Sequence, residues 1–224
     1  MTYTLAIFDM DGTILDTLDD LCNSVNATMQ HFGFPVHTLD EVRRFVGNGI
    51  PKLIERAVPE GTSPEKEKEA LDFFMPYYKA HCAEQTKPYE GICELLSALR
   101  AAGVKTAVVS NKADVAVKEL CEVYFDGIFD YALGATEQME KKPAPDSVLA
   151  VMRILGFSKE ESVYIGDSDV DLQTAKNAEL PCIAVEWGFR DSAFLKAHGA
   201  DCLVQKPEQI LDLILPATTQ NGTV

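Results

Sequence analysis

Short apolar segments of the kind found in buried strands alternate along most of this chain with patterns typical of amphipathic helices. Strands and helices in alternation imply right-handed crossovers and a mainly parallel sheet covered by helices on both faces. We therefore expect an α/β fold. The predicted strands are TLAIF (4–8), KTAVVS (105–110), SVYIG (162–166), PCIAVEW (181–187) and DCLV (201–204). The predicted helices span 94–99, 112–123, 146–155, 169–178 and 207–215.

The segment from 16 to 86 breaks this alternation, because its apolar residues recur at helical spacing and it contains no clear strand. Turn signals such as Gly33-Phe34-Pro35 separate its helical patterns. We expect an all-helical module inserted directly after the first strand, and a polar tail at the C-terminus. The predicted division is a core domain over 1–15 and 87–216, a helical domain over 16–86 and a tail over 217–224.

The composition narrows the choice of partner and compartment. A formal net charge of -15 argues against nucleic acid or an anionic membrane surface as the main partner, since both reward cationic patches. The six cysteines show no metal-binding spacing, which is typical of small buried residues in a reducing compartment. No apolar stretch approaches the ~20 residues of a membrane span, and the first apolar run is too short for a signal peptide. We expect a cytoplasmic protein that is a monomer or a homodimer.

Polar residues follow the predicted strands at the points where they end. Asp9 follows the first strand, Ser110 and Asn111 close the second, and Asp167 follows the third. Ligands of open α/β sheets bind beyond the carboxyl ends of the strands, so we expect these groups to meet at one rim. Lys142, in a proline-stiffened loop ahead of a helix, is placed to reach the same rim.

The stretch FDMDGT brings two carboxylates of this rim close together, because Asp9 and Asp11 lie two residues apart. Two unit charges ~4 Å apart repel by roughly 4 kcal/mol at an effective dielectric constant near 20. A third carboxylate, Asp167, adds to the repulsion, so the cluster must hold a proton or bind a cation. An all-oxygen site without Cys or His at matching positions suits Mg²⁺ better than zinc.

A metal ion, a lysine and hydroxyl donors are the equipment of phosphoryl transfer, in which positioning and charge neutralisation supply most of the catalysis. One carboxylate can attack phosphorus and form an aspartyl-phosphate. Its neighbour can protonate the leaving oxygen and later deprotonate a water molecule.

Taken singly, these motifs admit other interpretations. The D-x-D-G-T run is not an EF-hand calcium loop, because the sixth position is Ile14 rather than Gly and the twelfth is Asp20 rather than Glu. It is still compatible with a plain turn that carries two solvated acids. Ser110-Asn111 also suits a helix cap, Lys142 a solvated surface lysine, and 166–171 a helix start whose acids favour the dipole. Their order, each at a strand end or ahead of a helix, favours a shared site.

The four motifs resemble those of the haloacid dehalogenase-like superfamily in type and order. They are Asp9-Met10-Asp11-Gly12-Thr13, Ser110-Asn111, Lys142-Pro143 and Gly166-Asp167-Ser168-Asp169-Val170-Asp171. With the helical insert, which resembles a C1-type cap, they cover nearly the whole chain. The stretches DGTILDT, FVGNGIPKLIERA, SNK, KPAPD and VEWGFR are similar to the phosphoglycolate phosphatase-like branch. The resemblance implies a Rossmann-like core with a helical cap that closes over the site.

The resemblance also implies a role for each matching position. Asp9 would be the nucleophile and Asp11 the general acid/base. Ser110 would bind a phosphoryl oxygen, and Lys142 would neutralise the phosphate and the nucleophile. The metal ligands would be Asp9, Asp11 through its backbone carbonyl, Asp167 and Asp171, the last directly or as support. Further substrate-binding positions would be Gly12, Thr13 and Asn111.

Basic residues of the insert lie around the turn Gly47-Asn48-Gly49. The run is not a dinucleotide-binding fingerprint, because the third glycine is missing. It is either a helix–helix turn or a loop that touches the substrate when the insert closes. In the second case the substrate-binding residues are Arg44, Gly47, Asn48 and Lys52.

The expected reaction is Mg²⁺-dependent hydrolysis of a small phosphomonoester, and 2-phosphoglycolate is the substrate that the resemblance favours. Inorganic pyrophosphatase, nucleotide phosphatase and β-phosphoglucomutase activities stay open within the family. A haloacid dehalogenase would not need the second acid, Asp11. Outside the family, a non-enzymatic receiver-type switch also gathers acids, a hydroxyl residue and a lysine around Mg²⁺, but it predicts neither Asp11 nor a long helical insert.

Overall fold

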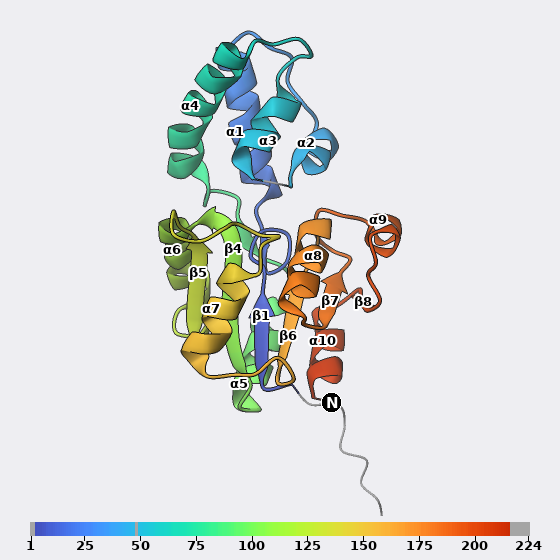
Figure 1. Ribbon diagram of the computed structural model, residues 1–224. Helices are drawn as coiled ribbons and strands as arrows, with labels where there is room; N and C mark the ends of the chain where they lie inside the picture. The colour runs from blue at the N-terminus through green and yellow to red at the C-terminus, as the bar shows by residue number, and fades with distance from the viewer. Residues whose placement is uncertain (1–2, 48, 216–224) are drawn as a thin grey trace, which may run out of the picture.

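Six parallel strands form the central sheet of the computed structural model, which describes residues 3–47 and 49–215. Their spatial order is β5-β4-β1-β6-β7-β8, and each strand runs parallel to its neighbours. β1 lies inside the sheet (Figure 1), so its carboxyl end opens near the centre of the rim. This sheet confirms the predicted α/β fold. The strands are β1 (Leu5–Phe8), β4 (Lys105–Ala113), β5 (Tyr131–Ala135), β6 (Ser162–Gly166), β7 (Cys182–Val185) and β8 (Leu203–Val204).

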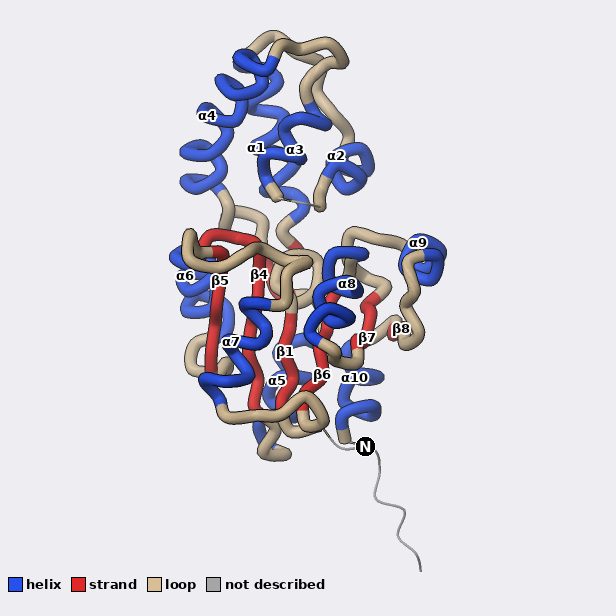
Figure 2. Tube along the Cα trace, in the orientation of Figure 1, coloured by secondary structure: helices blue, strands red, loops and turns tan. Residues whose placement is uncertain are grey.

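Helices cover both faces of the sheet, because successive side chains of each strand point to opposite sides. In β1, Leu5 and Ile7 pack against α7 and α8, whereas Ala6 and Phe8 pack in the cluster that contains α5, α6 and α10. Figure 2 shows the resulting three layers, with α9 beside the β8 edge. The helices of the core are α5 (Ile92–Ala101), α6 (Asp114–Phe125), α7 (Asp146–Leu155), α8 (Asp169–Ala178), α9 (Ser192–Ala197) and α10 (Pro207–Ile214).

The predicted boundary between the second core strand and its helix is wrong. The strand predicted at 105–110 continues to Ala113, so the helix predicted from Lys112 begins only at Asp114. The extension keeps its pairing with β5 across a register shift between Val109 and Ala113. Its polar side chains suit a loop or a helix start in the sequence, yet here they form the end of a strand at the rim.

β5 and α9 were not predicted, and β7 and β8 are shorter than the strands predicted at 181–187 and 201–204. The sequence of β5, YALGA, contains Gly134, which weakens a strand pattern. A Cβ at Gly134 would lie 2.5 Å from the Cα of Asp114, so the glycine permits the backbone of α6 to approach the strand closely. Such an approach is a tertiary contact that a local pattern does not reveal.

The helical insert stands over the carboxyl end of the sheet (Figure 1). Its buried apolar side chains form a cluster that also includes Phe189, from the core loop after β7. The chain passes between core and insert through a short antiparallel pair of strands, so Asp16 belongs to a strand that the prediction for 16–86 did not include. The elements are β2 (Leu15–Asp16), α1 (Leu18–His31), α2 (Leu39–Phe45), α3 (Ile50–Ala57), α4 (Pro64–His81) and β3 (Lys87–Pro88). No helix in residues 3–47 and 49–215 is long and apolar enough to span a bilayer.

A buried carboxylate fastens the two connections between insert and core. Asp20, in the first turn of α1, is 1% exposed. Its oxygens accept hydrogen bonds from the backbone N–H of Gln85 (2.9 Å) and of Thr86 (2.9 Å) and from the Thr86 hydroxyl (2.8 Å). The outgoing helix therefore supplies the acceptor that the returning segment needs just before β3.

We predict that Asp20→Ala lowers the free energy of unfolding by about 2–3 kcal/mol, because it leaves the buried Thr86 N–H without an acceptor. Asp19→Ala is the matched control, since it removes the same charge from the same helix turn but at an exposed position. We expect the control to cost about 0.5 kcal/mol, the part due to the helix dipole. Urea denaturation measures both, and equal effects of the two substitutions would show that the buried hydrogen bonds contribute nothing specific.

Candidate active site

The loop after β1 is a tight turn that places two carboxylates at the rim. The Asp9 N–H still donates to the Ile165 carbonyl (2.8 Å), so Asp9 continues the sheet. The N–H groups of Thr13, Ile14 and Leu15 all point at the Met10 carbonyl. This folding back sets Asp9 and Asp11 at the head of the turn.

Gly12 is required in this turn for two reasons. Its φ of +86° lies in the left-handed region that favours glycine. In addition, a Cβ at this position would lie 2.5 Å from Asp167 Oδ2. The absence of a side chain therefore lets the first motif approach the fourth.

Side chains from three separate segments meet at this rim: the turn after β1, the loop ahead of α7 and the segment that follows β6. Lys142 Nζ lies 2.8 Å from Asp9 Oδ1 and 2.8 Å from Asp171 Oδ1. One carboxylate oxygen each from Asp9, Asp167 and Asp171 lies within 4.8 Å of the other two. We call these three residues the acidic group. All three are buried, and so is Lys142.

The Asn111 side chain holds Lys142 in place by hydrogen bonds to the backbone of that lysine. Its Oδ1 accepts from the Lys142 N–H (2.8 Å), and its Nδ2 donates to the Lys142 carbonyl (2.9 Å). Ser110, one residue earlier, is 5% exposed and its Oγ accepts from the Lys112 N–H (3.1 Å). The second motif thus contributes Asn111, which orients Lys142, and the Ser110 hydroxyl, which lies on β4 next to β1.

Asp171 is held by protein donors on both of its oxygens. Lys142 and the Tyr164 hydroxyl (3.0 Å) donate to Oδ1, while the Ser168 hydroxyl (2.6 Å) donates to Oδ2 in a capping box at the start of α8. Tyr164 was not among the predicted site residues, because a tyrosine inside an apolar strand has the signature of a core residue. In the structure Asp171 chiefly fixes Lys142.

The loop after β7 holds Asp167, although no site residue was predicted in this loop. The Phe189 N–H donates to Asp167 Oδ2 (2.7 Å), and the Thr13 hydroxyl donates to Oδ1 (3.0 Å). Gly188 permits this close packing, since a Cβ there would lie 2.3 Å from the Asp167 Cβ. Trp187 Nε1 donates to the Thr13 carbonyl (3.0 Å) and ties the loop to the first motif.

Arg190 carries the same loop into contact with the insert. Its guanidinium donates to the carbonyls of Arg43 (3.1 Å) and Val46, and it lies 3.7 Å from Asp169 Oδ1. Together with the Phe189 side chain in the insert's apolar cluster, this arginine joins the segment that holds Asp167 to the helices above the rim.

Burial and mutual repulsion set the charge of the acidic group. Burial, followed by the nearby charge of Asp171, raises the pKa of Asp9 well above its ordinary value and that of Asp167 to about 7. Burial acts in the same direction on Asp171, but Lys142 and the donated hydrogen bonds outweigh it and lower the pKa of that carboxyl. One ammonium thus faces three carboxylates, and the remaining negative charge favours a bound cation or protons.

The acidic group matches the donor set of a hard divalent cation. Its ligand atoms are carboxylate oxygens, and in the described part of the chain neither Cys nor His joins them. Such donors suit Mg²⁺, Ca²⁺ or Mn²⁺ better than zinc. The side chain of Asp11 lies outside this group, because its Oδ1 accepts from Lys112 Nζ (2.9 Å).

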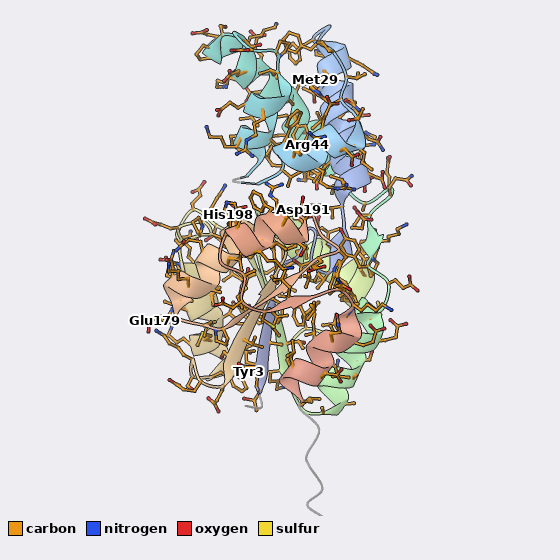
Figure 3. The ribbon with its side chains drawn as sticks, turned by 90° about the vertical axis from the view of Figure 1, so that its right-hand side faces the viewer. Tyr3, Met29, Arg44, Glu179, Asp191 and His198 are labelled. Atoms are coloured by element: carbon orange, nitrogen blue, oxygen red, sulfur yellow. The ribbon has the colours of Figure 1, made fainter. Side chains whose placement is uncertain are left out.

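Three of the four insert residues predicted to bind substrate are described, and these three contact neighbours other than the acidic group. Arg44 is exposed at the base of the insert and faces the core near Asp191 (Figure 3), beside a hollow of about 470 Å³ that both residues line. Lys52 pairs with Glu55 (2.6 Å) on an exposed helix face. A Cβ at Gly47 would lie 2.9 Å from Arg190 Nη2, and Asn48 lies outside the described residues. Substrate binding by these four residues stays a prediction.

Comparison with known proteins gives a family match over most of the chain. The model described as haloacid dehalogenase-like hydrolase matches residues 6–185. The phosphoglycolate phosphatase of Pseudomonas savastanoi pv. phaseolicola is 32% identical over 214 residues, which cover 93% of this chain and 76% of the relative. The phosphoglycolate phosphatase of Aquifex aeolicus is 30% identical over 209 residues, which cover 93% of this chain and 95% of the relative.

Solved structures agree with this match. A candidate phosphoglycolate phosphatase from Lactobacillus delbrueckii subsp. bulgaricus superimposes with a TM-score of 0.92 at 39% identity, over 96% of this chain and 100% of that chain. CbbY from Rhodobacter sphaeroides, solved in complex with phosphate, gives a TM-score of 0.75 at 26% identity, over 93% of this chain and 96% of that chain.

We predict that Asp167→Asn raises the melting temperature of the metal-free protein at pH 8, because it removes one of the buried negative charges. Because the folded-state pKa is raised to about 7, the wild-type carboxyl costs stability at every pH above its unfolded-state pKa of ~3.9. The cost is complete above about pH 7 and is relieved as the pH falls from 7 toward 4. The difference between variant and wild type should therefore shrink at pH 6. Each kcal/mol corresponds to roughly 2–4 °C in a chain of this size.

Thermal unfolding with and without millimolar Mg²⁺ measures this prediction. The wild type should gain stability from the ion, and Asp167→Asn should gain much less. Asp201→Asn, an exposed position on the core, serves as the control and should behave as the wild type. If Mg²⁺ stabilises Asp167→Asn and the wild type equally, Asp167 is not a ligand of the metal.

Proposed function

Because this chain belongs to the haloacid dehalogenase-like hydrolase family, we propose that it is a Mg²⁺-dependent phosphatase whose substrate is 2-phosphoglycolate. The observation that carries the proposal is the bridge of Lys142 between Asp9 and Asp171, beside Asp167. It places a carboxylate and a neutralising ammonium together at the point where the strands end. Phosphoryl transfer depends mainly on such positioning and charge neutralisation.

Asp9 is the proposed nucleophile. Its Oδ1 accepts from Lys142 (2.8 Å) and from the Met10 N–H (2.7 Å), so we assign the attack to the other oxygen, Oδ2. A bond from Oδ2 to phosphorus forms while the bond from phosphorus to the ester oxygen breaks, which gives an aspartyl-phosphate. In this proposal Lys142 and the Ser110 hydroxyl bind the phosphoryl oxygens.

Asp11 is the proposed general acid and base. It lies outside the acidic group, and its side chain is more exposed than that of Asp9. In the first step its proton passes to the leaving alcohol oxygen. In the second step it takes a proton from water, whose oxygen attacks phosphorus and releases inorganic phosphate together with free Asp9.

The acidic group fits Mg²⁺, since its donors are oxygens and two of its carboxyls otherwise favour protons. Asp9, Asp167 and the backbone carbonyl of Asp11 would hold the ion, with Asp171 as a ligand or as the support of Lys142. When bound, the ion supplies positive charge to the transferred phosphoryl oxygens.

The helical insert is the proposed cap. We assign residues 16–86 to it and residues 1–15 and 87–216 to the core. Its position over the rim supports a role in excluding water and limiting the size of the leaving group (Figure 1). The free state of all six cysteines supports a place in the reducing cytoplasm.

We predict that Asp9→Asn lowers phosphate release from 2-phosphoglycolate by about a thousandfold or more, because an amide cannot serve as the nucleophile. The fold should persist, as judged by thermal unfolding. Asp201→Asn is the matched control on the same domain and should keep wild-type activity. Near-normal phosphate release by Asp9→Asn would show that the nucleophile assignment is wrong.

A panel of substrates tests the proposed specificity. We expect the highest kcat/KM for 2-phosphoglycolate, compared with pyrophosphate, nucleoside monophosphates and β-glucose 1-phosphate. EDTA should abolish the activity and added Mg²⁺ should restore it. A clear preference for another member of the panel would contradict the proposed substrate, and full activity in EDTA would contradict the metal requirement.

A further inference from the structure

A second lysine with a largely buried side chain lies at the rim, and the proposed mechanism assigns it no role. Lys112 lies near the end of β4, two residues after Ser110, and its side chain is only 9% exposed. A lysine this far from water is uncommon unless it is paired. The extension of β4 beyond the predicted strand is what carries it there.

The partners of this lysine come from two different parts of the chain. Lys112 Nζ donates to Asp11 Oδ1 (2.9 Å), in the turn after β1, and to the Tyr78 hydroxyl (2.8 Å), on α4 of the insert. The ammonium also lies 5.0 Å from the centre of the Tyr78 ring. Tyr78 is itself 8% exposed and packs in the insert's apolar cluster. The contact therefore joins Asp11, the second carboxylate of the first motif, to the interior of the insert.

The two rim lysines serve different carboxylates. Lys142 contacts Asp9 and Asp171, whereas Lys112 contacts Asp11. The hydrogen bond from Lys112 to Asp11 accounts for the position of the Asp11 side chain outside the acidic group. Removing this ammonium would free the Asp11 carboxylate to turn, because Lys112 is the group in the described part of the chain that donates to it.

We propose that Lys112 is a positioning residue that holds the Asp11 carboxylate for proton transfer, and that Tyr78 makes this hold depend on the docked insert. This inference rests on the proposed phosphatase function. With the insert in place, the Tyr78 hydroxyl fixes the ammonium on one side and Asp11 is fixed on the other. If the insert moves away, Lys112 loses one of its two partners.

The step that Lys112 supports is protonation of the leaving group. As the bond from Asp9 Oδ2 to phosphorus forms and the bond from phosphorus to the ester oxygen breaks, the Asp11 proton moves to that oxygen. An alkyl leaving group needs this proton, because an alkoxide is a strong base, whereas p-nitrophenolate leaves without it. A misplaced Asp11 should therefore harm alkyl esters far more than an aryl ester.

The experiment measures kcat/KM of wild type and Lys112→Met for 2-phosphoglycolate, ethyl phosphate and p-nitrophenyl phosphate. This parameter covers the steps up to departure of the alcohol, so the later hydrolysis at Asp9, which is common to all three esters, does not enter. We expect a loss of about a hundredfold for both alkyl esters, the usual size of a general-acid contribution, and a loss at least tenfold smaller for the aryl ester.

Two further variants separate positioning from folding. Tyr78→Phe removes only the hydroxyl and should give a smaller loss in the same direction, selective for the alkyl esters. Lys118→Met is the matched control, since Lys118 forms an exposed surface pair with Asp114 in the helix that follows. It should leave all three kcat/KM values and the melting temperature unchanged.

Equal losses on all three esters, or no loss on any, would overturn the inference. A loss confined to 2-phosphoglycolate would also overturn it, because Lys112 would then recognise the substrate carboxylate rather than position Asp11. A wild-type protein that releases phosphate from none of the esters would contradict the proposed function itself, which is a different result from unequal variants of an active enzyme.

Discussion

Repulsion among buried carboxylates is the constraint on which the site depends. Asp9, Asp167 and Asp171 bring oxygens within 4.8 Å of one another, and the single ammonium of Lys142 touches only two of the three residues. Such a group is unstable unless further positive charge or protons reach it. The same property makes it reactive toward a phosphoryl group, because a cation that relieves the repulsion also neutralises the oxygens of the substrate. The buried charges at this rim therefore lower the stability of the fold while they serve the function.

The rest of the fold holds these charges in place. The central strand ends at Asp9, a glycine turn brings the first motif against Asp167, and Asn111 fixes the backbone of Lys142. The insert is joined to the site at several points rather than merely standing above it. The loop after β7 reaches it through Phe189 and Arg190, and Lys112 reaches it through Tyr78. A movement of the insert would thus act on Asp167 from one side and on Asp11 from the other.

The strand-end rule was enough to predict that Asp9 and Asp167 meet, because strand ends of a parallel sheet share an edge whatever the loops do. Lys142 was expected at the same rim from its proline-stiffened loop ahead of a helix. The supporting contacts were not predictable in this way. Lys112 was assigned to a helix, because the apolar residues that follow it, from Val115 to Cys121, recur along one helix face. Tyr164 and Tyr78 have the pattern of core residues, and their hydroxyl contacts join segments 7 and 34 residues apart in the chain. The Phe189 N–H that holds Asp167 is a backbone group, which no residue type reveals.

The proposed function requires a divalent cation among these acids. Anomalous diffraction from crystals of the protein soaked in Mn²⁺, which takes the same oxygen ligands as Mg²⁺, would locate such an ion. We expect one strong peak at the rim, within coordinating distance of a carboxylate oxygen of Asp9 and of Asp167 and near Lys142. Absence of a peak there, or a peak bound only by acids elsewhere on the surface, would contradict this requirement.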